Sequence, residues 1–117
     1  MSPDGDARDG TLDGDDAAFV MSIVEDGQLV RVTARGDVDV ESVTAFHDGL
    51  RTAVAGGSAA VRIDLAQVTF LGSEGIRTLV LLHESAAAQG TRITVSDASP
   101  IVRRVLTLTE SDWLLGD

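Results

Sequence analysis

The sequence has no cysteine, no lysine and no tyrosine, and all nine basic residues are arginine. Disulfides and thiol chemistry are therefore excluded, as are Schiff-base chemistry and phosphate loops that depend on lysine. There is no run of about 18 apolar residues to cross a membrane, and no basic start followed by an apolar stretch as in a signal peptide. We expect a cytoplasmic protein that does not insert into membranes.

What is present is enough for one acidic domain. The 117 residues are 44% hydrophobic, which suits a single core. The net charge is -10, and residues 1–16 contribute six aspartates and one arginine, so half of that charge lies in this segment. We predict a disordered acidic Gly/Asp-rich tail at 1–17 and one domain at 18–117. The acidic balance and the lack of a basic stripe argue against direct nucleic-acid binding.

Hydrophobic periodicity predicts the order of the elements. Strands are expected at 19–25, 29–35, 60–65 and 91–96, with a short last strand at 113–115; helices are expected from 42 to about 56, from 73 to about 89, and from 100 onward. Asp26-Gly27 indicates a two-residue hairpin, and residues 36–41 are interpreted as a connecting turn. The fold class is α/β: a single domain whose mixed sheet of four to five strands opens with an antiparallel hairpin, continues with parallel strands and packs against three to four helices.

The most informative position is Ser73, where an apolar strand segment gives way to an amphipathic helix. Serine is a favoured N-cap residue, so a purely structural role is one interpretation. The other is a switch, because a helix N-terminus has free N–H groups and a positive dipole end that favour an added phosphate. The sequence alone leaves both open.

Other chemistry is poorly supported. A nucleophile elbow needs glycine two residues before the serine, but Leu71 stands there, and no histidine follows His83 to act as base. His47 and His83 have no partner at metal-ligand spacing, so we expect no metal, no cofactor and no catalytic residue. Asp39, before the first helix, is either a cap or a contact residue.

Several motifs resemble one family, the STAS domains, named for sulphate transporters and anti-sigma factor antagonists. Gly36-Asp37-Val38-Asp39 is similar to the family's Gly-Glu-Leu-Asp turn. Asp64-Leu65, followed by Val68, Phe70, Ser73, Gly75 and Ile76, is similar to its Asp-Leu-x-x-Val-x-Phe-apolar-Asp-Ser-Ser/Thr-Gly-Leu/Ile motif. Gly90 and Ser99-Pro100 continue the resemblance, which spans about 19–115.

The resemblance implies partner switching. In stand-alone bacterial members, an anti-sigma factor with ATP-using kinase activity phosphorylates the first serine of that pair, the position of Ser73. The unphosphorylated protein binds the anti-sigma factor and frees a sigma factor; the phosphorylated protein dissociates until a phosphatase resets it. The implied partner-binding residues are Asp37, Asp39, Gly72, Ser73, Glu74, Gly75, Ile76 and Arg77.

The chain departs from the family motif on both sides of Ser73. Gly72 replaces the usual aspartate, and Glu74 replaces the second serine or threonine. A carboxylate beside the acceptor could disfavour a second negative charge, or could partly mimic the modified state. The same resemblance implies an alternative function, a regulatory subunit of a transporter ATPase or of a stress-signalling scaffold, without phosphorylation control.

Overall fold

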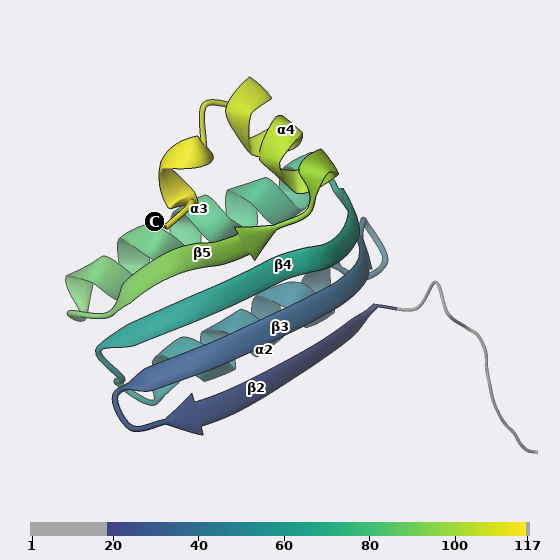
Figure 1. Cartoon of the computed structure of the whole chain (residues 1–117). Coiled ribbons are helices and arrows are strands. Elements are labelled where there is room, and N and C mark those ends of the chain that lie inside the picture. Colours follow the sequence, from purple (N-terminus) through teal and green to yellow (C-terminus); the bar gives the residue numbers. More distant parts are fainter. Residues whose placement is uncertain (1–18, 117) are drawn as a thin grey trace, which may run out of the picture.

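The computed structural model describes residues 19–116, so the predicted tail at 1–17 lies outside the described residues. These residues form one four-stranded sheet with three α-helices and a short 3₁₀ helix (Figure 1). The elements in chain order are β2 (Val20–Asp26), β3 (Leu29–Val38), α2 (Val43–Ala55), β4 (Ala60–Leu71), α3 (Ser73–Ala88), β5 (Arg92–Ala98), α4 (Pro100–Leu108) and η1 (Asp112–Leu114).

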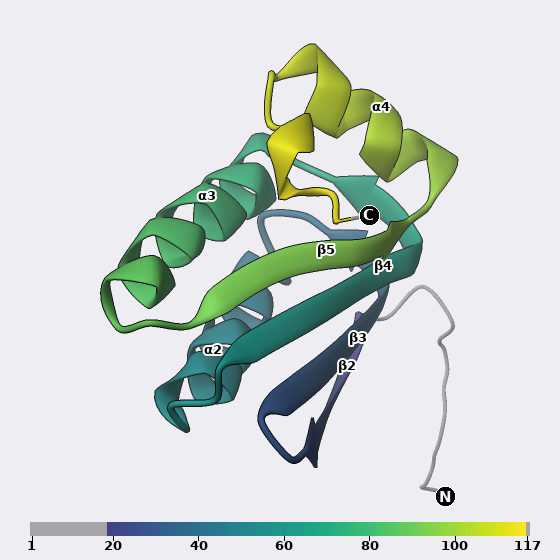
Figure 2. The ribbon, with the colours of Figure 1, turned by 60° about the vertical axis from the view of Figure 1, so that its left-hand side comes forward.

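The strand order across the sheet is β2-β3-β4-β5. β2 and β3 pair antiparallel, and β3, β4 and β5 are parallel. The helices α2 and α3 cover one face of the sheet, while α4 packs against β4 and β5 and the C-terminal turn lies beside β5 (Figure 2). The mixed α/β sheet expected from the sequence is confirmed, with an antiparallel hairpin first and parallel strands after it. No helix among residues 19–116 is long and apolar enough to cross a membrane.

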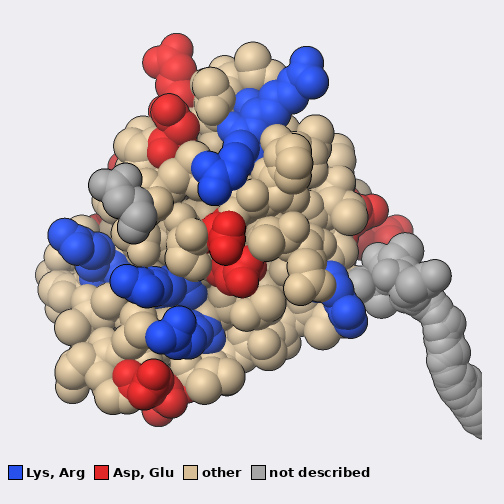
Figure 3. Space-filling model, in the orientation of Figure 1, with Lys and Arg blue, Asp and Glu red and all other residues tan. Residues whose placement is uncertain are grey.

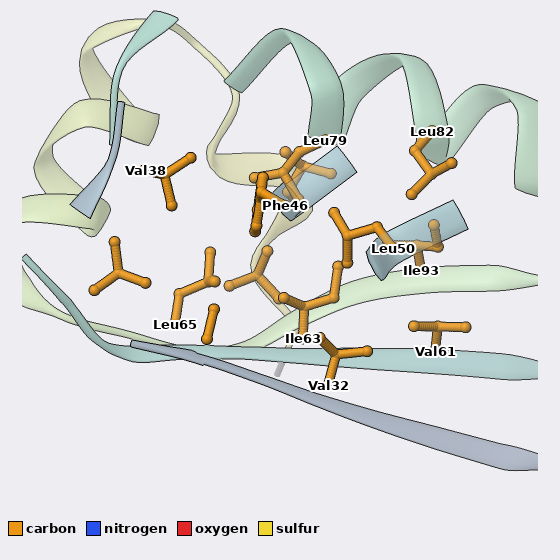
Figure 4. Close-up of a cluster of buried hydrophobic side chains, with 14 of the residues drawn as sticks. Val32, Val38, Phe46, Leu50, Val61, Ile63, Leu65, Leu79, Leu82 and Ile93 are labelled. Carbon is orange, nitrogen blue, oxygen red and sulfur yellow. The ribbon is translucent and has the colours of Figure 1, made fainter. Parts of the chain in front are cut away.

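The core lies between the sheet and helices α2 and α3 (Figure 4). Alternate residues of β3 and β4 point into it, because side chains of a strand face opposite sides in turn. Phe46 and Leu50 of α2 and Leu79 of α3 meet them and are completely buried. The period-two and helical patterns in the sequence therefore correspond to real buried faces.

Four local predictions need correction. The hairpin loop is Gly27-Gln28, because Asp26 pairs with Leu29. Residues 36–38 belong to β3 rather than to a turn, with an irregularity beside Gly36, whose φ of 100° suits glycine. β4 continues beyond residue 65 to Leu71. Residues 112–114 form a 3₁₀ turn, and only Leu115 makes a single parallel bridge, to Val95.

Candidate functional site

The ends of β3 and β4 bring two predicted motifs together. Val38 and Leu71, the last residues of these parallel strands, are paired in the sheet. The Gly72 amide then donates a hydrogen bond to the Val38 carbonyl at 3.0 Å. The residues that follow each strand therefore emerge side by side, a neighbourhood that the sequence could not establish.

Ser73 is the first residue of α3 and is exposed. The N-cap is Gly72, whose carbonyl accepts from the amides of Gly75 at 3.0 Å and Ile76 at 3.2 Å. Within residues 19–116 the Ser73 hydroxyl forms no hydrogen bond. The expectation that Ser73 starts the helix is confirmed, but its side chain does not cap that helix.

A shallow hollow of about 310 Å³ surrounds Ser73. Its lining residues are Val38, Asp39, Val40, Phe70, Gly72, Ser73, Glu74 and Gly75. Val40 is 83% exposed and Phe70 is 48% exposed, so the hollow has an apolar rim. Sequence reasoning did not place these two side chains in the site, because Val40 follows the same alternation as the buried Val38 and so gives no separate signal of exposure.

The turn before α2 fixes Asp39 firmly. Its carboxylate Oδ1 accepts hydrogen bonds from the amides of Glu41 at 3.0 Å and Ser42 at 3.1 Å, and from the Ser42 hydroxyl at 3.1 Å. Partial desolvation alone would raise the pKa of this carboxyl, but the hydrogen bonds from Ser42 and Glu41 outweigh it and hold the pKa below its ordinary value. Asp39 therefore stabilises the turn and presents a negative charge to the hollow.

Asp37 plays a different part. Its carboxylate accepts a hydrogen bond from the Thr69 hydroxyl, which links β3 to β4 just before the site. Its carbonyl also accepts from the Ser42 hydroxyl at 2.6 Å. The structure thus places Asp37 beside the hollow as a support for its walls, and not among the lining residues.

Gly75 and Ile76 are buried and position the start of α3. A Cβ atom on Gly75 would lie 2.7 Å from Leu71 Cδ1 and 2.9 Å from Val38 Cγ1, so only glycine lets the helix approach the strands this closely. Ile76 is 8% exposed and belongs to the core. Of the predicted partner-binding residues, these two offer little surface to a partner.

Glu74 and Arg77 line a second hollow, of about 420 Å³, between α2 and α3. His47, Arg51 and Leu81 also line it. Glu74 borders both hollows, so the Ser73 site continues along the helices as one uneven surface. An approaching partner would meet acidic groups near Ser73, and then the arginines Arg77 of α3 and Arg51 of α2 in the second hollow.

The two histidines lie apart. His47 is on α2, where its Nδ1 is 3.3 Å from the exposed Asp48 carboxylate. His83 is on α3 and packs edge-on against Trp113, with ring centroids 4.8 Å apart. Among residues 19–116 no three histidine or acidic side chains come together as a possible metal site.

Comparison with known proteins gives one consistent result. The family model described as Mlab, STAS domain, matches residues 21–116, which is most of the chain. A STAS-domain containing protein of Pseudomonas aeruginosa (strain UCBPP-PA14) is 28% identical over 89 residues, covering 76% of this chain and 87% of the relative.

Solved structures agree on the fold. An anti-sigma factor antagonist from Mycobacterium paratuberculosis is 25% identical, with a TM-score of 0.75 over 85% of this chain and 84% of that one. The Bacillus cell fate determinant SpoIIAA, an anti-sigma factor antagonist, was solved in two forms. Its unphosphorylated form is 21% identical, with a TM-score of 0.69 over 86% and 87% of the two chains. Its phosphorylated form is 20% identical, with a TM-score of 0.64 over 86% and 90%.

Proposed function

The chain belongs to the STAS domain family, and we propose that it acts within that family as an anti-sigma factor antagonist controlled at Ser73. In this role the unphosphorylated chain binds an anti-sigma factor kinase and releases a sigma factor, in the cytoplasm. Phosphorylation of Ser73 ends the complex, and a phosphatase restores it. The chain itself performs no catalysis.

The observation that carries the proposal is the state of the Ser73 side chain. It is exposed at the first residue of α3, inside a hollow with an apolar rim, and its hydroxyl makes no hydrogen bond to the described residues 19–116. A kinase could therefore reach it without unfolding the protein. A phosphate there would also lie at the positive end of the helix dipole, which favours an anion by about 0.3–1 kcal/mol. Modification would change the surface while preserving the fold.

The same geometry supports the proposed release of the partner on phosphorylation. A partner seated on Val40 and Phe70 would cover Ser73, because all three line one hollow. A phosphate at that point would bring about -1.5 to -2 charges into a contact that already holds Asp39 and Glu74. Burying that charge without a cation costs several kcal/mol, so affinity should fall by ~2 to 3 decades.

Gly72 and Glu74 are the two positions beside Ser73 at which this chain departs from the family motif, and the structure accommodates both. A Cβ on Gly72 would lie 3.3 Å from Phe70 Cε2, so the usual aspartate would press on the ring that forms the rim. The observed position of the Phe70 ring therefore depends on glycine at position 72. Glu74 is exposed in the first turn of α3, where the helix dipole favours its charge.

The proposal is tested with purified chain, the candidate anti-sigma factor kinase and ATP. We expect intact-mass spectrometry to show one added phosphate on the wild-type chain and on Ser42→Ala, whose hydroxyl is tied into a turn, but none on Ser73→Ala. Ser73→Ala should bind the kinase as tightly as the unmodified chain, and Ser73→Asp should bind ~2 to 3 decades more weakly. Equal affinity of the two Ser73 variants would refute the switch.

A second candidate is a fixed regulatory subunit of a transporter ATPase, the alternative that the family resemblance also implies. One observation favours keeping it, because Gly72 and Glu74 alter both neighbours of the acceptor serine. In this case affinity purification with Ser73→Ala and Ser73→Asp baits should recover the same ATPase on both. Recovery of a kinase-type anti-sigma factor on the alanine bait alone would exclude it.

A further inference from the structure

The sheet face opposite α2 and α3 is open, and arginines gather on the half of it that ends at the β2–β3 hairpin. Figure 3 looks onto this face and shows basic side chains side by side over the half of the sheet that ends at the β2–β3 hairpin. Strand alternation assigns the residues, since the exposed positions of β3, β4 and β5 alternate with core positions. The arginines that face outward are Arg31, Arg35, Arg62 and Arg92.

Register brings like charges together on this face. Arg31 of β3 is the direct pairing partner of Arg62 of β4. Arg92, at the start of β5, lies on the next strand, two residues before the partner of Arg62. Like charges on directly paired positions destabilise a sheet, so the fold gains nothing from this row. Such a concentration of positive charge in a protein of net charge -10 points to an acidic binding partner.

Aspartates share this face, but Asp64 and its exposed pairing partner Asp97 of β5 lie farther along the strands than the row of Arg31, Arg62 and Arg92. Asp64 is half-buried, and its carboxylate accepts a hydrogen bond from the amide of Ala66 at 2.9 Å. Asp26 lies at the hairpin end of β2. Within residues 19–116 the only contact between opposite charges within 4.0 Å is that of His47 with Asp48, on the other side of the sheet.

We propose that the acidic segment 4–16 of the same chain binds across the arginines of this face. The segment has six aspartates and one arginine, so its charge complements the arginine row. It precedes Val20, the first residue of β2, and Val20 pairs with Arg35. The attachment point is therefore already at the edge of this face.

Distance permits this contact. Val20 pairs with Arg35 and Val24 with Arg31, so the row begins ~13 Å along β2 from Val20. An extended chain from Val20 back to residue 4 spans up to ~50 Å, enough to cross all four strands. A hollow of about 220 Å³ lined by Val20, Ser22, Thr33, Arg35 and Gln67 opens onto the same face and gives the segment a place to begin.

The test uses the full chain, which has no cysteine, with one nitroxide spin label on Thr11→Cys. At low salt we expect the amide NMR signals of Thr33 and Thr94 to lose roughly half of their intensity or more, and those of Thr52 and Ser85, on the helices, to remain. At ~0.5 M salt the lost intensity should return, because the screening length shrinks to a few ångströms.

Charge variants distinguish binding to the arginine row from nonspecific proximity of the spin label to the domain. Arg31→Gln with Arg62→Gln should abolish the loss at low salt, while the matched pair Arg51→Gln with Arg104→Gln should leave it unchanged. Equal loss on both faces, or loss that survives Arg31→Gln with Arg62→Gln, would overturn the proposal. So would loss that arises only between spin-labelled and isotope-labelled copies in a mixture, which would assign the contact to a second molecule.

Discussion

The two turns that lead into α3 and α4 use serine in opposite ways. At the start of α4, the Ser99 hydroxyl donates to the Val68 carbonyl at 2.7 Å and accepts from the Val102 amide at 3.4 Å. At the start of α3, Gly72 provides the cap through its backbone, and the hydroxyl of Ser73 is left exposed. Ser99 therefore serves the fold, whereas Ser73 is available for another purpose.

The difference arises from how each helix is held. The beginning of α3 is fixed by the close packing of Gly75 on Leu71 and Val38 and by the bond from Gly72 to Val38. With its backbone secured in this way, the helix needs no side-chain cap. Whether a serine at a helix start acts as a cap therefore depends on whether packing and backbone hydrogen bonds already fix that end of the helix.

The largest expected effect is at Gly75. Gly75→Val should lower the free energy of unfolding by about 1–3 kcal/mol, because its side chain would overlap Leu71 and Val38. Urea denaturation measures this. Gly56→Ala is the control, since Gly56 has a φ of -72° and open space around it, and should change stability by no more than about 1 kcal/mol, in the stabilising direction. Wild-type stability of Gly75→Val would mean that packing does not hold α3.

A smaller loss is expected at the capping serine. Ser99→Ala should cost about 1–2 kcal/mol, because it removes both the cap of the Val102 amide and the bond to Val68. Thermal and urea unfolding would measure the loss. If Ser99→Ala were as stable as the wild type, the contrast between the two turns would be lost.

The hydrogen bonds to the Asp39 carboxylate in the turn before α2 should make the free energy of unfolding depend on pH. The folded-state pKa of Asp39 is lowered, so its ionised form contributes stability above the ordinary value of 3.8, and that contribution is lost as the pH falls through the folded pKa. Asp39→Asn should therefore reduce the decline in stability between about pH 5 and pH 2. Urea midpoints at several pH values would test this, and identical pH profiles would contradict it.

The smallest effect on folding should be at Ser73. Ser73→Ala should leave the free energy of unfolding within about 0.5 kcal/mol of the wild type, because the hydroxyl is exposed and makes no hydrogen bond within the described part of the chain. Measuring it beside Ser99→Ala gives the comparison directly. A loss as large as that of Ser99→Ala would return Ser73 to the role of a structural cap.

The sequence predicted the sheet and helices because their apolar residues follow the two regular periods. It misjudged residues 36–38, since a glycine between polar residues is typical of a turn. In the structure Gly36 sits at an irregularity in the pairing of β3 with β4, and the strand continues through it. The pairing of β3 with β4 therefore outweighs the local preference of a glycine between polar residues for a turn.

The site was predictable only in part. Ser73 and Asp39 could be named from their places next to predicted helices. Val40 and Phe70 could not, because their exposure depends on how far β3 and β4 extend and on where Gly72 turns the chain. The burial of Ile76 follows the helical period and could have been anticipated from Leu79 and Val80.

The bridge between Leu115 and Val95 also bears on self-association. Leu115 and the Gly116 amide, which donates to the Val95 carbonyl at 2.9 Å, occupy the middle of the outer edge of β5. A strand from another molecule cannot pair along that edge without displacing them. Among the described strands, sheet extension is thus restricted to the outer edge of β2. Two copies joined there would form a closed pair, so this bridge directs any edge-to-edge association towards a dimer and away from a fibre.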